Sequence, residues 1–89
     1  MNLYSIHCGF YDEEISEGIY EFHVNIPIVA ESLEQAKAQV RKISVFQKKK
    51  MHIDGIQEIK TVNGYSIKIM KDHNLSDQTV VDNHLHRDL

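Results

Sequence analysis

The sequence predicts one α+β domain: a mostly antiparallel four-stranded sheet with one helix packed on one face, in the order β-β-α-β-β. Three observations support this prediction. Residues 19–30 alternate apolar and polar side chains with the period of a strand. Residues 31–46 carry apolar side chains at helical spacing behind a capping motif. Residues 56–70 form two short apolar runs around an Asn-Gly pair, a strong hairpin signal.

A first strand is expected over Leu3–Cys8, with Tyr4, Ile6 and Cys8 on one face. Gly9 is expected to end it. The acidic segment over residues 10–18 is long for a hairpin connection, so we expect it to fold over the sheet edge or to stay mobile.

The second strand, residues 19–30, has the clearest alternation of the chain. Pro27 has no backbone N–H to donate, so it should face a sheet edge or a bulge. The apolar side chains fall on one face and the polar ones on the other: Tyr20, Phe22, Val24, Ile26 and Ile28 against Glu21, His23 and Asn25.

The helix is expected over residues 31–46. Ser32 is a favourable N-cap, and Gln35 completes a capping box three residues later. Glu34 near the start and Arg41 near the end suit the helix dipole. The stripe expected to be buried consists of Leu33, Ala36, Val40 and Ile43.

The register of the hairpin around Asn63-Gly64 depends on its loop length. A two-residue loop would pair Lys60 with Ile67 and mix charge into the apolar face. A three-residue loop would pair Ile59 with Ile67 and keep the faces consistent, so we expect three residues. The helix would then cover a sheet face that carries Phe22, Val24, Ile26, Ile59 and Ile67.

The folded domain is expected to span residues 1–71. Residues 72–89 are polar with few apolar side chains, which predicts a tail that is flexible or docks on another surface. The net charge of -3 argues against a dedicated nucleic-acid binder. A single cysteine, Cys8, excludes an internal disulfide and is expected to be a small buried hydrophobe. With no apolar run of bilayer length and no secretory signal pattern, we expect no membrane association and a cytoplasmic protein.

Short motifs along residues 3–69 carry a family resemblance. They include Glu21-Phe22-His23, the helix entry over residues 29–37, and His52-Ile53-Asp54-Gly55 followed by Val62-Asn63-Gly64-Tyr65. Together they resemble a family of small bacterial proteins of unassigned function, catalogued as domain of unknown function 1543. The opening motif, Gly9-Phe10-Tyr11-Asp12, departs from the family pattern at Phe10, because a second glycine is expected after Gly9. The resemblance implies no activity, but it draws attention to four polar residues: Glu21, His23, His52 and Asp54.

Those four residues form two pairs, Glu21-x-His23 and His52-x-Asp54. On a strand, residues two apart share a face, so each pair offers two ligands on one side. Imidazole and carboxylate together suit zinc or another divalent transition metal. The alternative is structural: His52 caps a loop by hydrogen bonds, and Asp54 forms an Asx-turn before Gly55.

The longest basic run is Lys48-Lys49-Lys50. It offers a loose, salt-sensitive contact for nucleic acid. A solvated helix end favoured by the dipole is the interpretation we prefer. In the tail, His84-x-His86 is either a site for stray metal or a solvated terminus.

No Ser-His-Asp set and no glycine-rich phosphate loop is present, so the sequence favours a non-enzyme. The function we favour from the sequence is an interaction module, a homo-oligomer that meets itself or another protein through its sheet face or edge. The alternative is a ligand or metal site at Glu21, His23, His52 and Asp54. Nucleic-acid binding through the lysine run ranks third.

Overall fold

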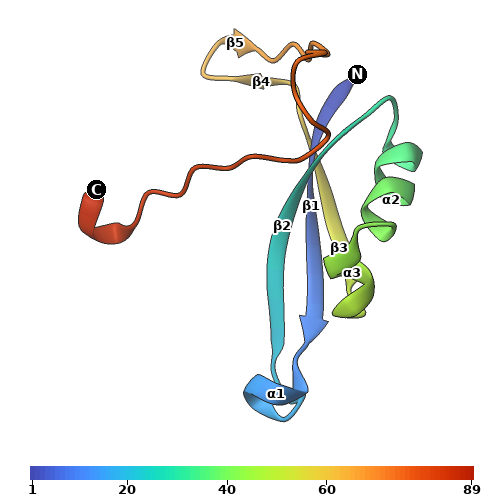
Figure 1. The fold of residues 1–89 in the computed structure, drawn as a ribbon, viewed down its shortest axis with the longest axis vertical. Helices are drawn as coiled ribbons and strands as arrows, with labels where there is room; N and C mark the ends of the chain where they lie inside the picture. The colour runs from blue at the N-terminus through green and yellow to red at the C-terminus, as the bar shows by residue number, and fades with distance from the viewer.

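The computed structural model describes the backbone of residues 1–89 and every side chain except that of Ser16. The fold is α+β, as predicted, and its parts are arranged as Figure 1 shows. The elements are β1 (Asn2–Tyr11), α1 (Glu13–Ser16), β2 (Glu21–Ala30), α2 (Leu33–Arg41), α3 (Ser44–Lys48), β3 (His52–Ile59), β4 (Thr61–Val62), β5 (Tyr65–Ser66) and a final 3₁₀ turn, η1 (His86–Asp88).

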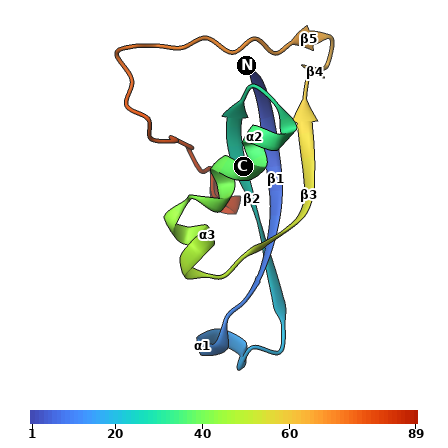
Figure 2. The same cartoon turned by 90° about the vertical axis from the view of Figure 1, so that its right-hand side faces the viewer.

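The central strand is β1, which pairs antiparallel with β2 on one side and with β3 on the other. Because both neighbours run antiparallel to β1, they run parallel to each other, and the chain between them passes through α2 and α3. Both helices lie on one face of the sheet, as the view in Figure 2 shows. The predicted four-stranded sheet is wrong, since β4 and β5 form a separate two-stranded sheet beyond the end of β3.

The hairpin has a two-residue loop, so the predicted three-residue loop is wrong. Val62 pairs with Tyr65 across Asn63 and Gly64. Both loop residues have positive φ, 52° and 85°, as a type I′ turn requires. Asparagine and glycine tolerate this conformation, and its twist matches that of paired strands. Since the hairpin is not part of the main sheet, the apolar face of that sheet does not constrain its register.

The covered face of the sheet differs from the prediction at two positions. Ile59 pairs with Leu3 and lies on the open face, the side opposite α2 and α3. Ile56, three residues earlier, takes the helix side because it pairs with Ile6. Ile67 lies after β5, outside the three-stranded sheet. The other three predicted positions pair with residues on the helix side of β1: Phe22, Val24 and Ile26.

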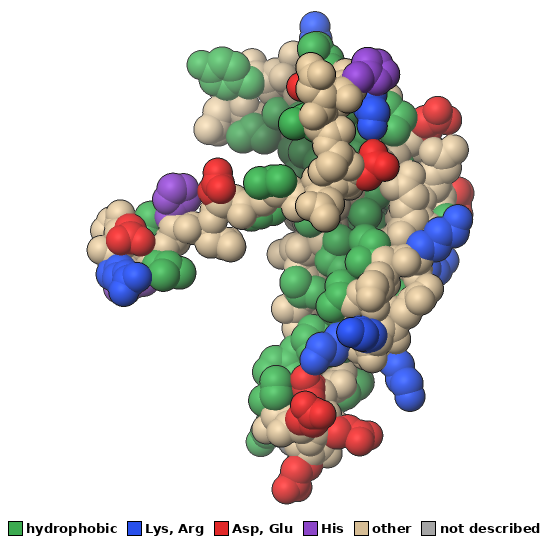
Figure 3. Space-filling model, in the orientation of Figure 1, with side chains coloured by type: hydrophobic (Ala, Val, Ile, Leu, Met, Phe, Trp, Pro, Cys, Tyr) green, Lys and Arg blue, Asp and Glu red, His purple; other side chains and the backbone are tan. Residues whose placement is uncertain are grey.

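Strand β1 continues through Gly9 to Tyr11, farther than predicted, because all ten of its residues pair with β2. The acidic segment that follows contains one helical turn, α1. The Asp12 carboxylate caps this turn by accepting from the Glu14 backbone N–H at 3.0 Å. Acidic side chains gather around this end of the molecule in Figure 3.

The single predicted helix is two helices, α2 and α3, with a break at Lys42 and Ile43. The N-cap prediction is confirmed: the Ser32 hydroxyl accepts from the Gln35 backbone N–H at 3.2 Å. Leu33 is 48% exposed, so its predicted burial is wrong. The chain changes direction at this break, and α3 then contributes the buried side chain of Phe46 to the core.

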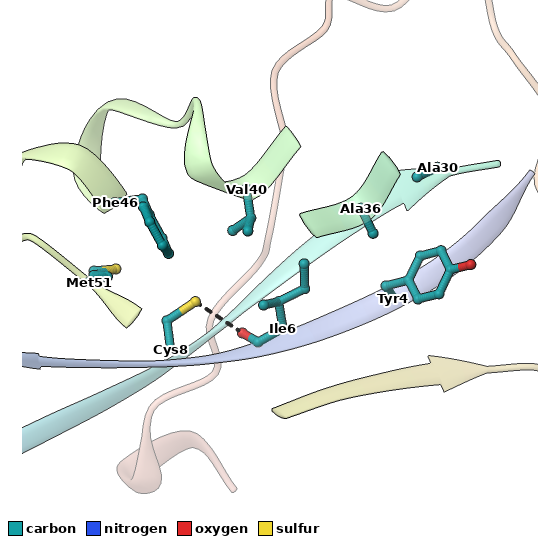
Figure 4. Packing of buried hydrophobic residues seen from close by; sticks show 8 residues of the cluster. All are labelled: Tyr4, Ile6, Cys8, Ala30, Ala36, Val40, Phe46 and Met51. Atoms are coloured by element: carbon teal, nitrogen blue, oxygen red, sulfur yellow. Dashed lines mark hydrogen bonds between the residues drawn. The ribbon is translucent and has the colours of Figure 1, made fainter. Parts of the chain in front are cut away.

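The core lies between β1 and the two helices (Figure 4). The prediction that Cys8 is a buried hydrophobe is confirmed, since its side chain is fully buried. Burial raises the pKa of the Cys8 thiol, and the nearby Asp54 carboxylate raises it further. The buried apolar side chains are Tyr4, Ile6, Cys8, Ala30, Ala36, Val40, Phe46 and Met51.

Residues 72–89 are exposed throughout and form no element except η1. The start of this segment borders a groove of about 820 Å³ at one end of the sheet, which is also lined by Leu3, Ile28 and Ile43. Docking of the tail on a further surface stays a prediction. The longest helix, α2, has nine residues. None of the helices in the described chain has the length and apolar character needed to cross a bilayer.

Candidate metal centre

The two residue pairs singled out in the sequence meet on the open face, at the end of the sheet where β2 and β3 begin. Gly9 of β1 is the register partner of both His23 in β2 and His52 in β3. Directly paired residues on neighbouring strands point to the same face, so the two imidazoles flank Gly9. Glu21 and Asp54 lie two residues from these histidines and join them on that face.

The polar atoms of these four side chains converge. The Nε2 atom of His23 lies 3.1 Å from Glu21 Oε1 and 3.0 Å from Asp54 Oδ2. The Nε2 atom of His52 lies 2.8 Å from Glu21 Oε1 and 3.2 Å from Asp54 Oδ1. The four side chains are 29–46% exposed, so solvent reaches them. We call them the His–carboxylate cluster.

Strand β3 has a β-bulge at Asp54. Its neighbours Ile53 and Gly55 pair with successive residues of β1, so Asp54 is the extra residue and has no partner there. Asp54 keeps the open-face position that alternation from His52 gives it, and Gly55 takes the place opposite His7.

Gly9 provides the space in which the cluster converges. A Cβ atom at this position would lie 2.6 Å from His52 Nε2 and 2.7 Å from Asp54 Oδ2, and closer still to Glu21 Oε1. Real Cβ atoms do not approach other heavy atoms this closely. Glycine is needed here because three polar side chains occupy the place of a side chain.

The structural alternative for His52 and Asp54 does not describe their positions. Both residues lie within β3, not in a loop. The Asp54 carboxylate contacts two imidazoles from different strands. The expectation that each i, i+2 pair shares one face is confirmed.

His7 lies beside the cluster on the open face, and it is not among the candidate ligands predicted from the sequence. Its ring stacks on that of His23 with centroids 4.7 Å apart and planes 5° from parallel. On the other side of Gly9, the Tyr11 hydroxyl lies 3.5 Å from Glu21 Oε2. Strand alternation is the signal that could have found both residues, because each is two positions from Gly9.

The basic run is partly used in packing. The Lys49 ammonium donates to Asp12 Oδ2 at 2.9 Å and lies 5.7 Å from the centre of the Phe10 ring. This hydrogen bond is the main reason that the pKa of Asp12 is lowered and that of Lys49 is raised. Lys49, the middle residue of the candidate basic patch Lys48–Lys50, therefore links the end of α3 to the start of α1 through its ion pair with Asp12. Basic side chains over α3 border acidic ones in Figure 3.

Comparison with known proteins places the chain in a family. A protein-family model described as Domain of Unknown Function (DUF1543) matches residues 19–69, which include all four residues of the His–carboxylate cluster. Searches of curated proteins and of solved structures found no match. Because the matched residues make up more than half of the chain, this protein belongs to the DUF1543 family.

Proposed function

We propose that this protein binds a divalent transition metal ion at the His–carboxylate cluster, through Glu21, His23, His52 and Asp54. The observation that carries the proposal is the convergence of two imidazole nitrogens and two carboxylates from separate strands over Gly9. Two nitrogen and two oxygen donors suit zinc and its first-row neighbours.

The distances in the cluster fit a metal coordination sphere. Around an ion with bonds of about 2.1 Å, neighbouring donor atoms lie about 3.0–3.4 Å apart. The separations between histidine nitrogens and carboxylate oxygens are 2.8–3.2 Å. Small outward movements of the side chains would therefore admit an ion. Two carboxylates would also balance the charge of one divalent ion when both imidazoles are neutral.

The accessibility of the cluster supports an open site. Four protein ligands fill the tetrahedral shell of a structural zinc ion, whereas a reactive zinc ion also binds water or substrate, in some cases as a fifth ligand. Here each ligand is partly exposed, so a bound ion would remain in contact with solvent.

Zinc titration of the full chain, prepared without a histidine tag, tests the proposal. Zinc at 100 times its Kd should stabilise the fold by about 2.7 kcal/mol, which raises Tm by about 10 °C or more in a domain of this size. The double variant E21Q/H52A should lose this shift. Calorimetry gives the affinity directly.

Two controls keep the result specific. The variant H84A/H86A removes the tail histidines, which lie outside the cluster, and should bind zinc as the unmodified chain does. The variant E34Q removes an exposed carboxylate from α2 and should also have no effect. Absence of binding, or binding that disappears only in H84A/H86A, would overturn the proposal.

A second candidate is the homo-oligomer favoured by the sequence. The observation in its favour is that β2 and β3 are both edge strands, and β2 offers ten residues along its outer side. An unpaired strand edge is a template for pairing with a second chain. Pro27 lies on this edge strand, as predicted, and limits such pairing to one part of it. We keep the cytoplasm as the proposed compartment because the single cysteine is a free thiol.

Size-exclusion chromatography with light scattering tests this second candidate. A dimer mass that returns to the monomer mass in V24K, a charge on the exposed part of β2, is the expected result. A monomer mass at every concentration up to about 1 mM would contradict it.

A further inference from the structure

His7 has the features of an additional metal ligand. Its Nδ1 atom lies 2.8 Å from the Asn25 side-chain oxygen. Because a carbonyl oxygen only accepts, this contact needs the proton on Nδ1, and the neutral imidazole then has its lone pair on Nε2. Histidines that bind metals are held in this way by a hydrogen bond from the other ring nitrogen. One ligand atom from each of His7, His23 and Asp54 lies within 4.8 Å of the others.

The two oxygens of Asp54 face different histidines. Oδ2 lies 3.0 Å from His23 Nε2, and Oδ1 lies 3.2 Å from His52 Nε2. A carboxylate in this position can bind two ions, one through each oxygen. Two sets of three ligands share Asp54: Glu21, His52 and Asp54 form one, and His7, His23 and Asp54 form the other. Glu21 Oε1 lies nearer to His52, at 2.8 Å, than to His23, at 3.1 Å.

We propose that the cluster binds two divalent transition metal ions with Asp54 as the bridging ligand. Glu21 and His52 complete the first site. His7 and His23 complete the second after one of the two stacked rings rotates, because an imidazole lone pair lies in the plane of its ring. This proposal rests on the proposed function, to which it adds a second ion and a fifth ligand. Ions bridged in this way lie about 3.5–4 Å apart.

The charge of the two-ion centre has a consequence. Two carboxylates leave two divalent ions with a net charge of +2. A hydroxide or another small anion from solvent would complete the coordination, and the partial exposure of the ligands allows its entry. Asn25 acts on the second site only, because it orients His7.

Counting the bound ions tests the proposal. Metal-free protein in the H84A/H86A background should bind two zinc ions per chain by calorimetry and by elemental analysis after dialysis. Adding H7A should leave one. Adding N25A should weaken the second ion by about 10–100-fold, as loss of an orienting partner does, and should leave the first unchanged. With Cu²⁺ as a probe, the two-ion form should show the spin coupling of a close copper pair, which H7A abolishes.

The outcomes separate the two proposals. One zinc ion per chain, with an affinity that H7A does not change, would overturn the two-ion centre and leave the single-ion site standing. No bound zinc at all would overturn both. Circular dichroism of the metal-free variants shows whether each is folded, and S5A, a substitution of another open-face residue of β1, serves as the matched control for H7A.

Discussion

Replacing Gly9 with alanine is expected to lower zinc affinity by more than about 100-fold while the domain stays folded. The new Cβ would lie 2.6 Å from His52 Nε2 and 2.7 Å from Asp54 Oδ2, and closer to Glu21 Oε1. These atoms end flexible side chains, so they can swing into solvent at small cost. Their convergence is lost as a result, and a loss of several ligands exceeds the 10–100-fold effect of one orienting residue.

Gly55→Ala is the matched control for Gly9→Ala. Gly55 also lies in a strand of the same sheet, but a Cβ there would meet no atom within 4 Å. The G55A variant should bind zinc with the affinity of the unmodified chain. In urea unfolding, the free energy of unfolding of both variants should lie within about 0.5 kcal/mol of that of the unmodified chain, as is usual for surface changes. A G9A variant that binds zinc normally would show that the metal does not use this cluster.

Ile6→Ala is expected to destabilise the fold by about 2–5 kcal/mol, the usual cost of removing most of a buried aliphatic side chain. Ile6 is fully buried in the central strand, between its register partners Ile26 and Ile56, and belongs to the same core as Val40. Domains of this size have a total stability of about 5–10 kcal/mol. The variant should therefore lose a large fraction of it.

Urea unfolding followed by circular dichroism measures this loss. Val80→Ala is the control, because Val80 is 83% exposed and its truncation should change the free energy of unfolding by less than about 0.5 kcal/mol. A loss below about 1 kcal/mol for I6A would mean that the face of β1 carrying Tyr4, Ile6 and Cys8 is not the core.

The predictable part of the fold was local. Alternation along the first two strands identified their faces, and the Ser32 cap located the start of α2. The break between α2 and α3 was not predictable from apolar spacing, because Ile43 fits the stripe even though its backbone is extended. The hairpin register was missed because the preference for three residues assumed that β4 and β5 extend the main sheet.

The cluster was predictable only as two separate pairs. Spacing of two residues places Glu21 with His23, and His52 with Asp54, on common faces. Nothing in either pair reveals that the other is adjacent. That depends on the register of both strands against Gly9.

By itself, the sequence determined the α+β class, the strand faces of β1 and β2, the helix start and the four candidate ligands. Only the tertiary structure decided that β1 is the central strand, that the register against Gly9 brings the two pairs together, and that His7 stacks on His23. The physical reason is that propensity and periodicity act over a few residues, whereas strand order and register depend on contacts between segments distant in the chain.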